Sequence, residues 1–185
     1  MAANPFATIM NVFVLNAGRC GSTTFVQACK HISNFSASHE SRSTLTGEQR
    51  LSYPDNHIEA DNRLCWMLGR LDHEYGNDAY YVHLTRDRQQ SVQSFVKRKD
   101  YGIMLAYREG VLMGGQQQPA AEIASDYLDT VAHNIALFLK DKRHKMSFNL
   151  DRAGKDFADF WQWIGARGEL EKALAEWQVH YNASV

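Results

Sequence analysis

A run of consecutive apolar residues, Val12–Leu15, stops at a turn of small residues that is followed by a helical pattern. Continuous apolar character, without alternation, is typical of a parallel strand buried on both faces. The turn, residues 16–24 (NAGRCGSTT), holds two glycines, one arginine and three hydroxyl groups. A strand, a glycine-containing turn and a helix N-terminus direct several backbone N–H groups at one point, which is how proteins bind phosphate-like anions. We therefore expect an anion site here.

The alternation of strand and helix continues along the chain. Strands are expected at 11–16, at 35–38 (ending at His39-Glu40), and at 58–61, 80–85 and 146–150. Helices are expected at 22–33, 62–75, 88–99, 120–142, 152–164 and 168–181. Residues 41–57 are expected to be a polar loop with at most one short helix, and 99–119 a loop. Such alternation predicts a central parallel sheet with helices on both faces, a three-layer α/β fold. The length of 185 residues fits one domain, 1–185.

The overall charge restricts the class of partner. The formal net charge is −1, so no global basic field attracts nucleic acid or a membrane surface. No apolar run approaches the roughly 18 residues that span a bilayer, and the first residues lack a basic, apolar leader pattern. We expect a cytoplasmic protein without a membrane span, whose anion site is a local feature.

The three cysteines, Cys20, Cys29 and Cys65, are scattered and form no CxxC pair. This spacing favours a reducing compartment and argues against a disulfide framework or a zinc site. Cys20 lies inside the anion turn, where the pKa of a thiol could fall. The favoured interpretation is a small residue accepted in a tight loop. No metal site is expected.

The turn departs from the nucleotide-binding P-loop, G-x-x-x-x-G-K-[ST], at two positions. Asn16 stands where the first glycine would be, and Ser22 stands where the lysine would be. Without that lysine the loop is poorly equipped for phosphoryl transfer with Mg²⁺. Arg19 instead places its cation before the second glycine of the turn.

That arrangement resembles the K/R-[SC]-G-[ST]-[ST] turn of sulfotransferases that use 3′-phosphoadenosine 5′-phosphosulfate (PAPS). The resemblance implies a P-loop NTPase-like fold of sulfotransferase type and a turn that holds the 5′-phosphosulfate. The residues it assigns to the donor are Gly18, Arg19, Cys20, Gly21, Ser22, Thr23 and Thr24. Arg19 would also stabilise the sulfuryl group in the transition state. A sulfuryl group carries less charge than a phosphoryl group, so fixed donors and one cation can suffice without a metal.

A second segment resembles the 3′-phosphate site of the same family, a strand followed by R-D-x-x-x-x-x-x-S in a helix. Here Arg86 follows the strand at 80–85 and Ser94 lies eight residues later. By resemblance Arg86 supplies a two-pronged contact to the 3′-phosphate and Ser94 a hydroxyl. Arg98, just beyond, would assist in binding the donor. Both motifs occur in the family's order.

The base that takes the acceptor's proton is expected at the end of the 35–38 strand, where the resemblance places a His-Glu pair. Glu40 is the first choice and His39 the second. A general base of this kind contributes about 10²–10⁴-fold to a rate. A polar strand end that only faces solvent is the competing interpretation.

The resemblance covers residues 11–41 and 79–98, and two departures qualify it. The chain is short for the family, and no K-G-x-x-G-x-W segment is present, which points to the bacterial or Golgi-type branches. The expected function is transfer of a sulfuryl group from PAPS to an acceptor hydroxyl, or an amine, with PAP as product. A non-catalytic PAP-binding module and a small nucleotide kinase are the alternatives. The acceptor, a small molecule or a carbohydrate, and homo-oligomer formation stay open.

Overall fold

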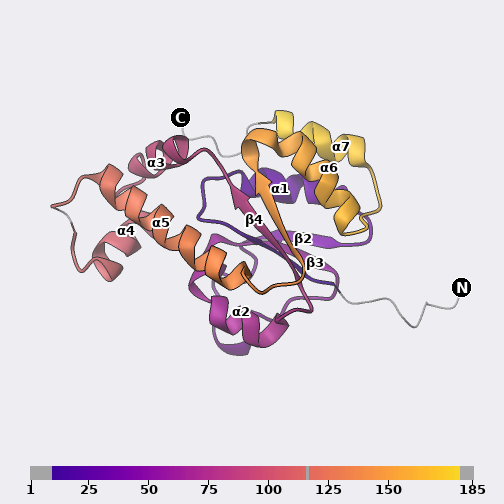
Figure 1. The fold of residues 1–185 in the computed structure, drawn as a ribbon, viewed down its shortest axis with the longest axis horizontal. Coiled ribbons are helices and arrows are strands. Elements are labelled where there is room, and N and C mark those ends of the chain that lie inside the picture. Colours follow the sequence, from indigo (N-terminus) through magenta and orange to yellow (C-terminus); the bar gives the residue numbers. More distant parts are fainter. Residues whose placement is uncertain (1–9, 116, 180–185) are drawn as a thin grey trace, which may run out of the picture.

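Five parallel strands form one sheet, and its central strand carries the glycine-containing turn (Figure 1). The structure, a computed structural model, describes residues 10–115 and 117–179. The strands are β1 (Val12–Leu15), β2 (Ser36–His39), β3 (His57–Ala60), β4 (Tyr80–Thr85) and β5 (Lys145–Asn149), in the order β2-β3-β1-β4-β5. The predicted parallel α/β sheet is confirmed.

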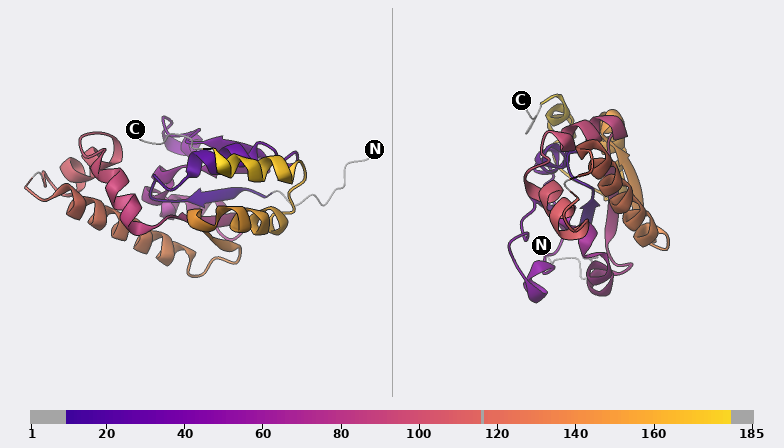
Figure 2. Two further views of the ribbon diagram at one scale, coloured as in Figure 1. Left: turned by 90° about the horizontal axis from the view of Figure 1, so that it is seen from above. Right: turned by 90° about the vertical axis from the view of Figure 1, so that its left-hand side faces the viewer.

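Helices cover both faces of the sheet (Figures 1 and 2). One face packs against α1 (Ser22–Cys29), α6 (Ala153–Trp163) and α7 (Leu170–Ala175). The other packs against α2 (Leu68–Tyr75), α3 (Arg88–Val96), α4 (Gly102–Ala106) and α5 (Ala120–Leu139). None of the helices in the described part of the chain is long and apolar enough to cross a bilayer.

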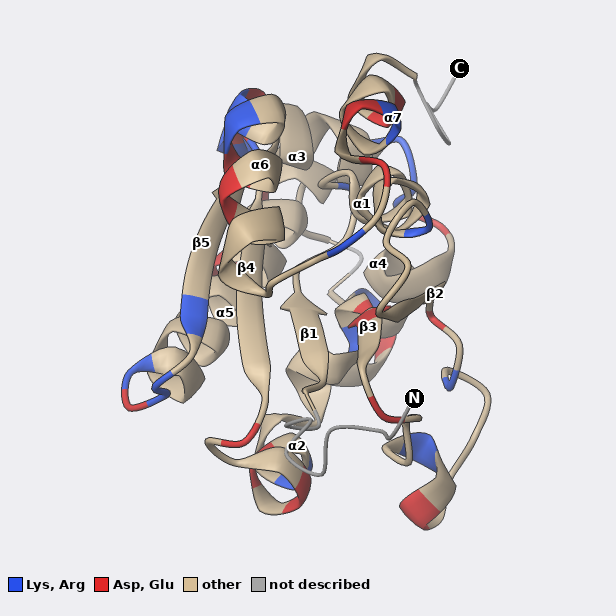
Figure 3. Ribbon diagram, turned by 90° about the vertical axis from the view of Figure 1, so that its right-hand side faces the viewer, with Lys and Arg blue, Asp and Glu red and all other residues tan. Residues whose placement is uncertain are grey.

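The apolar run of β1 is explained by burial on both faces. Val12 and Val14 pack with α1 and α6, whereas Phe13 and Leu15 pack with the helices of the opposite face. Successive side chains of a strand point to opposite faces, so a strand between two helix layers has apolar residues at every position. The central strands β1 and β4 carry no Lys, Arg, Asp or Glu, as Figure 3 shows.

The helix expected at 62–75 is two elements, a 3₁₀ helix η2 (Asn62–Trp66) and α2, separated at Met67. Asp61 caps the first, because its carboxylate accepts a hydrogen bond from the backbone N–H of Arg63 at 2.8 Å. A 3₁₀ turn repeats every three residues and an α-helix every 3.6, so both keep an apolar stripe on one side. Apolar spacing alone could therefore not reveal the break.

The segment 99–119, expected as a loop, contains α4 and a π-helical turn (Tyr107–Val111). Met104 and Tyr107, three residues apart, are buried among residues of α5 and the sheet, and this burial stabilises a short helix where the sequence predicted a loop. Elsewhere the expected helices are shorter. The first ends at Cys29 and the long one at Leu139, and 168–181 contains α7 and a 3₁₀ turn (Glu176–Gln178), with 180–181 outside the described residues.

A buried ion pair fixes the end of β3 to the segment before it. The guanidinium of Arg50, in the 3₁₀ turn Gly47–Arg50, donates to the carboxylate of Asp61 at 2.5 Å and to the hydroxyl of Tyr53 at 3.3 Å. Both charged side chains are almost fully excluded from solvent, at 2% and 0% exposure. Because Asp61 also caps η2, the pair determines where η2 begins.

Asp61→Ala should destabilise the protein by about 3–5 kcal/mol, because it leaves the guanidinium of Arg50 buried without its carboxylate. Urea unfolding followed by circular dichroism measures this. The exposed Asp55, replaced by alanine, is the control and should change the free energy of unfolding by less than about 0.5 kcal/mol. A loss below about 1 kcal/mol for Asp61→Ala would contradict the assignment.

Candidate functional site

The turn between β1 and α1 lies at the carboxyl edge of the sheet and is held from three sides. Within it, the side chain of Asn16 donates to the carbonyl of Val14 and accepts from the N–H of Gly18, both at 2.9 Å. The hydroxyl of Tyr127, on α5, donates to the carbonyl of Ala17 at 2.7 Å. The thiol of Cys65, on η2, donates to the carbonyl of Asn16 at 3.0 Å. The backbone of the turn is therefore fixed before any ligand binds.

The turn uses left-handed backbone conformations. The φ angles of Gly18, Arg19 and Gly21 are 90°, 58° and 88°. Gly21 is required for two reasons, since its φ disfavours other residues and a Cβ atom there would lie 2.7 Å from the side chain of Leu150. These left-handed residues fold the turn tightly ahead of α1, and a helix leaves its first backbone N–H groups without partners inside the helix. This geometry suits an anion.

The structure brings the second predicted segment to this turn. Arg86, directly after β4, donates from Nη1 to the backbone carbonyl of Arg19 at 3.3 Å. Ser94, on α3, accepts a hydrogen bond from Nε of Arg19 at 3.0 Å. Arg86 also donates twice to the neutral side chain of Gln90, at 2.6 and 3.2 Å. Residues 67 and 75 positions apart in the sequence thus lie in contact.

Three guanidinium groups gather at this point. Burial lowers the pKa of Arg19, and the nearby positive charges of Arg98 and Arg86 lower it further, partly offset by the hydroxyl of Tyr101. Arg98 stacks over the ring of Tyr101 at 5.4 Å. Like charges held together cost free energy that a bound anion would recover. The cluster therefore concentrates positive charge beside the turn.

The hydroxyl residues of the turn take different positions. Ser22 begins α1, and its Oγ lies 3.0 Å from Nε2 of His39 at the end of β2. Thr23 is partly exposed, whereas Thr24 is buried under the turn. Ser22 therefore connects the anion turn to His39, one of the two candidate general bases. The side chain of Thr24 packs beneath the turn.

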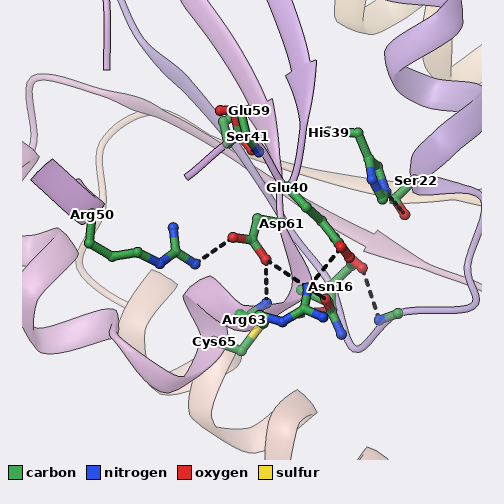
Figure 4. Close-up of polar contacts among 12 residues, drawn as sticks. Asn16, Ser22, His39, Glu40, Ser41, Arg50, Glu59, Asp61, Arg63 and Cys65 are labelled. Carbon is green, nitrogen blue, oxygen red and sulfur yellow. Dashed lines mark hydrogen bonds and ion pairs between the residues drawn. The ribbon is translucent and has the colours of Figure 1, made fainter. Parts of the chain in front are cut away.

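Glu40 follows β2 in a left-handed conformation, with a φ of 53°. Its carboxylate pairs with the guanidinium of Arg63, on η2, at 2.8 Å, and its N–H donates to the carbonyl of Ala60 at 3.0 Å (Figure 4). A third of the Glu40 side chain is exposed. His39 and Glu40 thus point to different neighbours, one toward the start of α1 and the other toward η2.

A buried carboxylate holds the turn that contains Glu40. Glu59, on β3, is fully buried and accepts hydrogen bonds from the N–H of Ser41 at 2.8 Å and from its hydroxyl at 2.6 Å. Nε2 of His57 lies 3.1 Å from the same carboxylate, and Nδ1 of His57 lies 2.7 Å from the hydroxyl of Ser36. Sequence reasoning missed this network. Its signal is the polar pair His57 and Glu59 within a strand that is buried at every position.

The favoured interpretation of Cys20, a small residue accepted in a tight loop, agrees with its burial, and an activated thiol does not. Cys20 is buried, and burial raises the pKa of its thiol from 9.0 to about 12. Burial likewise raises the pKa of Cys65 to about 12 and that of Cys29 well above its usual value. The position needs a small side chain, and the thiol has no chemical part. Within residues 10–115 and 117–179, no three or more His, Cys, Asp or Glu side chains are grouped to hold a metal ion.

Iodoacetamide at pH 8 should leave all three thiols unmodified in the folded protein. Raising the pKa from 9.0 to about 12 reduces the thiolate fraction about a thousandfold, and burial blocks the reagent as well. Intact mass spectrometry counts the added groups, and the urea-unfolded protein, which should gain three, is the control. Rapid labelling of Cys20 in the folded state would contradict this account.

Comparison with known proteins gives a structural relationship. The solved structure described as "Sulfotransferase Domain from the Curacin Biosynthetic Pathway" matches with a TM-score of 0.64 over 88% of this chain and 75% of that one, at 13% identity. No protein-family model and no curated protein matches the sequence. An identity this low relates the folds alone. The chain has a sulfotransferase-like fold, as its motifs predicted.

Proposed function

We propose that this protein transfers the sulfuryl group of PAPS to an acceptor hydroxyl and releases PAP. The observation that carries the proposal is the meeting of two separated motifs, with Arg19 bonded to Ser94 at 3.0 Å and Arg86 bonded to the backbone of Arg19 at 3.3 Å. A sulfotransferase-like fold supports it. Segments this close can be contacted by the two ends of one adenosine-based donor.

In this proposal the turn 18–24 binds the 5′-phosphosulfate through its backbone N–H groups and the start of α1. Arg86 and Ser94 bind the 3′-phosphate, with Arg98 adding positive charge beside them. Arg86 exchanges its contact with Gln90 for the 3′-phosphate, whereas Ser94 keeps the hydrogen bond from Arg19 and donates its own hydroxyl proton to the phosphate. Gln90, a neutral partner of Arg86, competes weakly with a phosphate dianion for that guanidinium.

The acceptor oxygen forms a bond to sulfur while the bond from sulfur to the bridging oxygen breaks, and the electron pair stays on the 5′-phosphate of PAP. The acceptor's proton passes to a carboxylate of the protein. Negative charge develops on the bridging and sulfuryl oxygens, beside which Arg19 is already fixed by its hydrogen bond to Ser94. A cation fixed in advance stabilises this charge without reorganisation.

We assign the base to Glu40. Its carboxylate offers about four acceptor positions, of which the contact with Arg63 uses one, and a third of the side chain is exposed to an incoming acceptor. The Nε2 atom of His39 already shares a hydrogen bond with the hydroxyl of Ser22, so it is less accessible to an acceptor. The hydrogen bonds of Ser41 to Glu59 hold the turn that carries Glu40 in place. His39 then positions the hydroxyl of Ser22 toward the donor.

The other two candidate functions have weaker support. A nucleotide kinase needs a cation where Ser22 stands, and here the Ser22 hydroxyl contacts His39. A non-catalytic binding module explains the arginine cluster, and it leaves the strained turn at Glu40 and its buried support without a purpose. A preference for PAP over Mg²⁺-ATP separates a sulfotransferase from a kinase. Substitution of Glu40 separates an enzyme from a binding module.

PAP should bind the wild-type protein at micromolar concentration, and Arg86→Ala should weaken it about 10- to 100-fold through loss of a charged hydrogen-bond pair. Isothermal titration calorimetry measures both. The matched control is Arg88→Ala, since Arg88, the first residue of α3, lies two positions beyond Arg86 and pairs at the surface with Asp129, 2.7 Å away. Wild-type protein that binds Mg²⁺-ATP more tightly than PAP would favour the kinase and overturn the proposal.

Glu40→Gln should lower turnover about 10²–10⁴-fold while PAP affinity changes less than about twofold, because the amide cannot take the acceptor's proton. Transfer of ³⁵S from labelled PAPS, measured with an acceptor found by screening, gives kcat and KM. His39→Gln is the comparison and should lower turnover less. The opposite order of the two effects would assign the base to His39, and unchanged turnover in both variants would reject the pair.

A further inference from the structure

The short helix η2 lies against the anion turn. The amide of Asn62, its first residue, lies 3.1 Å from the point where a Cβ on Gly18 would be. The next residue, Arg63, pairs with Glu40, the proposed base. The thiol of Cys65 is bonded to the turn. An acceptor that reaches Glu40 therefore meets η2.

Residues three apart in a 3₁₀ helix lie directly above one another, so Arg63 and Trp66 share one side of η2. Three residues at a rise of about 2.0 Å place their backbones roughly 6 Å apart along the axis. Trp66 is 40% exposed and Arg63 is 44% exposed. A large indole is thus open to solvent on the same side as the guanidinium that contacts Glu40.

The indole rests on a supported stack of rings. Trp66 lies nearly parallel to Tyr127, with ring centroids 6.4 Å apart and an interplanar angle of 26°, and it contacts Tyr107 at 6.1 Å. Tyr127 is buried and bonded through its hydroxyl to Ala17 of the anion turn. The platform and the donor site are therefore joined through one side chain, which fixes their separation.

We propose that Trp66 is the acceptor platform and that the acceptor is a planar aromatic hydroxyl compound of phenol type. This inference rests on the proposed sulfuryl transfer. The acceptor ring would extend the stack of Tyr127 and Trp66 in the offset arrangement that aromatic rings favour. Its hydroxyl would then lie toward Glu40, which takes the proton as the oxygen bonds to sulfur and PAP departs.

The polarity of this side of η2 favours an aromatic ring over a sugar. A sugar needs several hydrogen-bonding side chains around its ring, whereas on this side of η2 the exposed group next to the pair Arg63–Glu40 is apolar. The surface offered beside them is the flat indole of Trp66. Carbohydrate acceptors are accordingly the competing outcome of the test.

The experiment measures acceptor binding and turnover separately from donor binding. Calorimetry first establishes PAP affinity for the wild type, Trp66→Ala, Trp66→Phe and the control Leu137→Ala, an exposed apolar residue on α5. Binding of 2-naphthol to each PAP-saturated protein is then titrated. Its saturated counterpart decahydro-2-naphthol and methyl glucoside are titrated alongside, and all three compounds are assayed with ³⁵S-labelled PAPS.

We expect 2-naphthol to bind and to be sulfated, and Trp66→Ala to weaken its binding and raise its KM at least tenfold. Trp66→Phe should restore much of the loss, PAP affinity should change less than twofold, and Leu137→Ala should have no effect. Three results would overturn the platform if PAP still binds tightly: a preference for methyl glucoside, equal use of the saturated alcohol, or no dependence on Trp66. Each of them would leave the proposed function standing. Absence of PAP binding in the wild type would overturn the proposed function and this inference with it.

Discussion

The parallel pairing of β1 with β4 is the constraint on which the candidate site depends. Their register, Val12 opposite Tyr80 through Leu15 opposite His83, ends both strands at the same edge of the sheet. Parallel strands present their carboxyl ends together, so the turn after β1 and Arg86 after β4 emerge side by side. Pairing of β1 with β3 on its other side adds Asp61 and η2 to the same edge.

Buried polar contacts then convert this edge into a defined geometry. The pair Arg50–Asp61 sets the start of η2, and Glu59 holds the turn at Glu40 through Ser41. Burying such groups is costly unless each is hydrogen-bonded, and each of these has bonded partners. They are better explained by the need to fix the loops at the site than by stability, for which apolar residues would serve as well.

Much of the fold was predictable because its signals are local. Runs of apolar residues marked β1 and β4, and the glycine-containing turn marked the start of α1. The missed features depend on contacts with distant residues. The π-helical segment forms because Tyr107 is buried against α5, and the buried Glu59 is satisfied by Ser41, 18 positions away. Motif similarity could name candidate residues, and it could not state their contacts.

By itself the sequence determined the α/β class and the chemistry of the turn, since apolar periodicity and the placement of glycine, arginine and hydroxyl residues act over a few positions. Only the tertiary structure decided that Arg86 and Ser94 meet that turn, that Glu40 pairs with Arg63, and that Trp66 of the same short helix is exposed. The physical reason is that such contacts join strands and helices far apart in the chain. Sheet order and buried hydrogen bonds, which no short segment encodes, determine which of these ends meet.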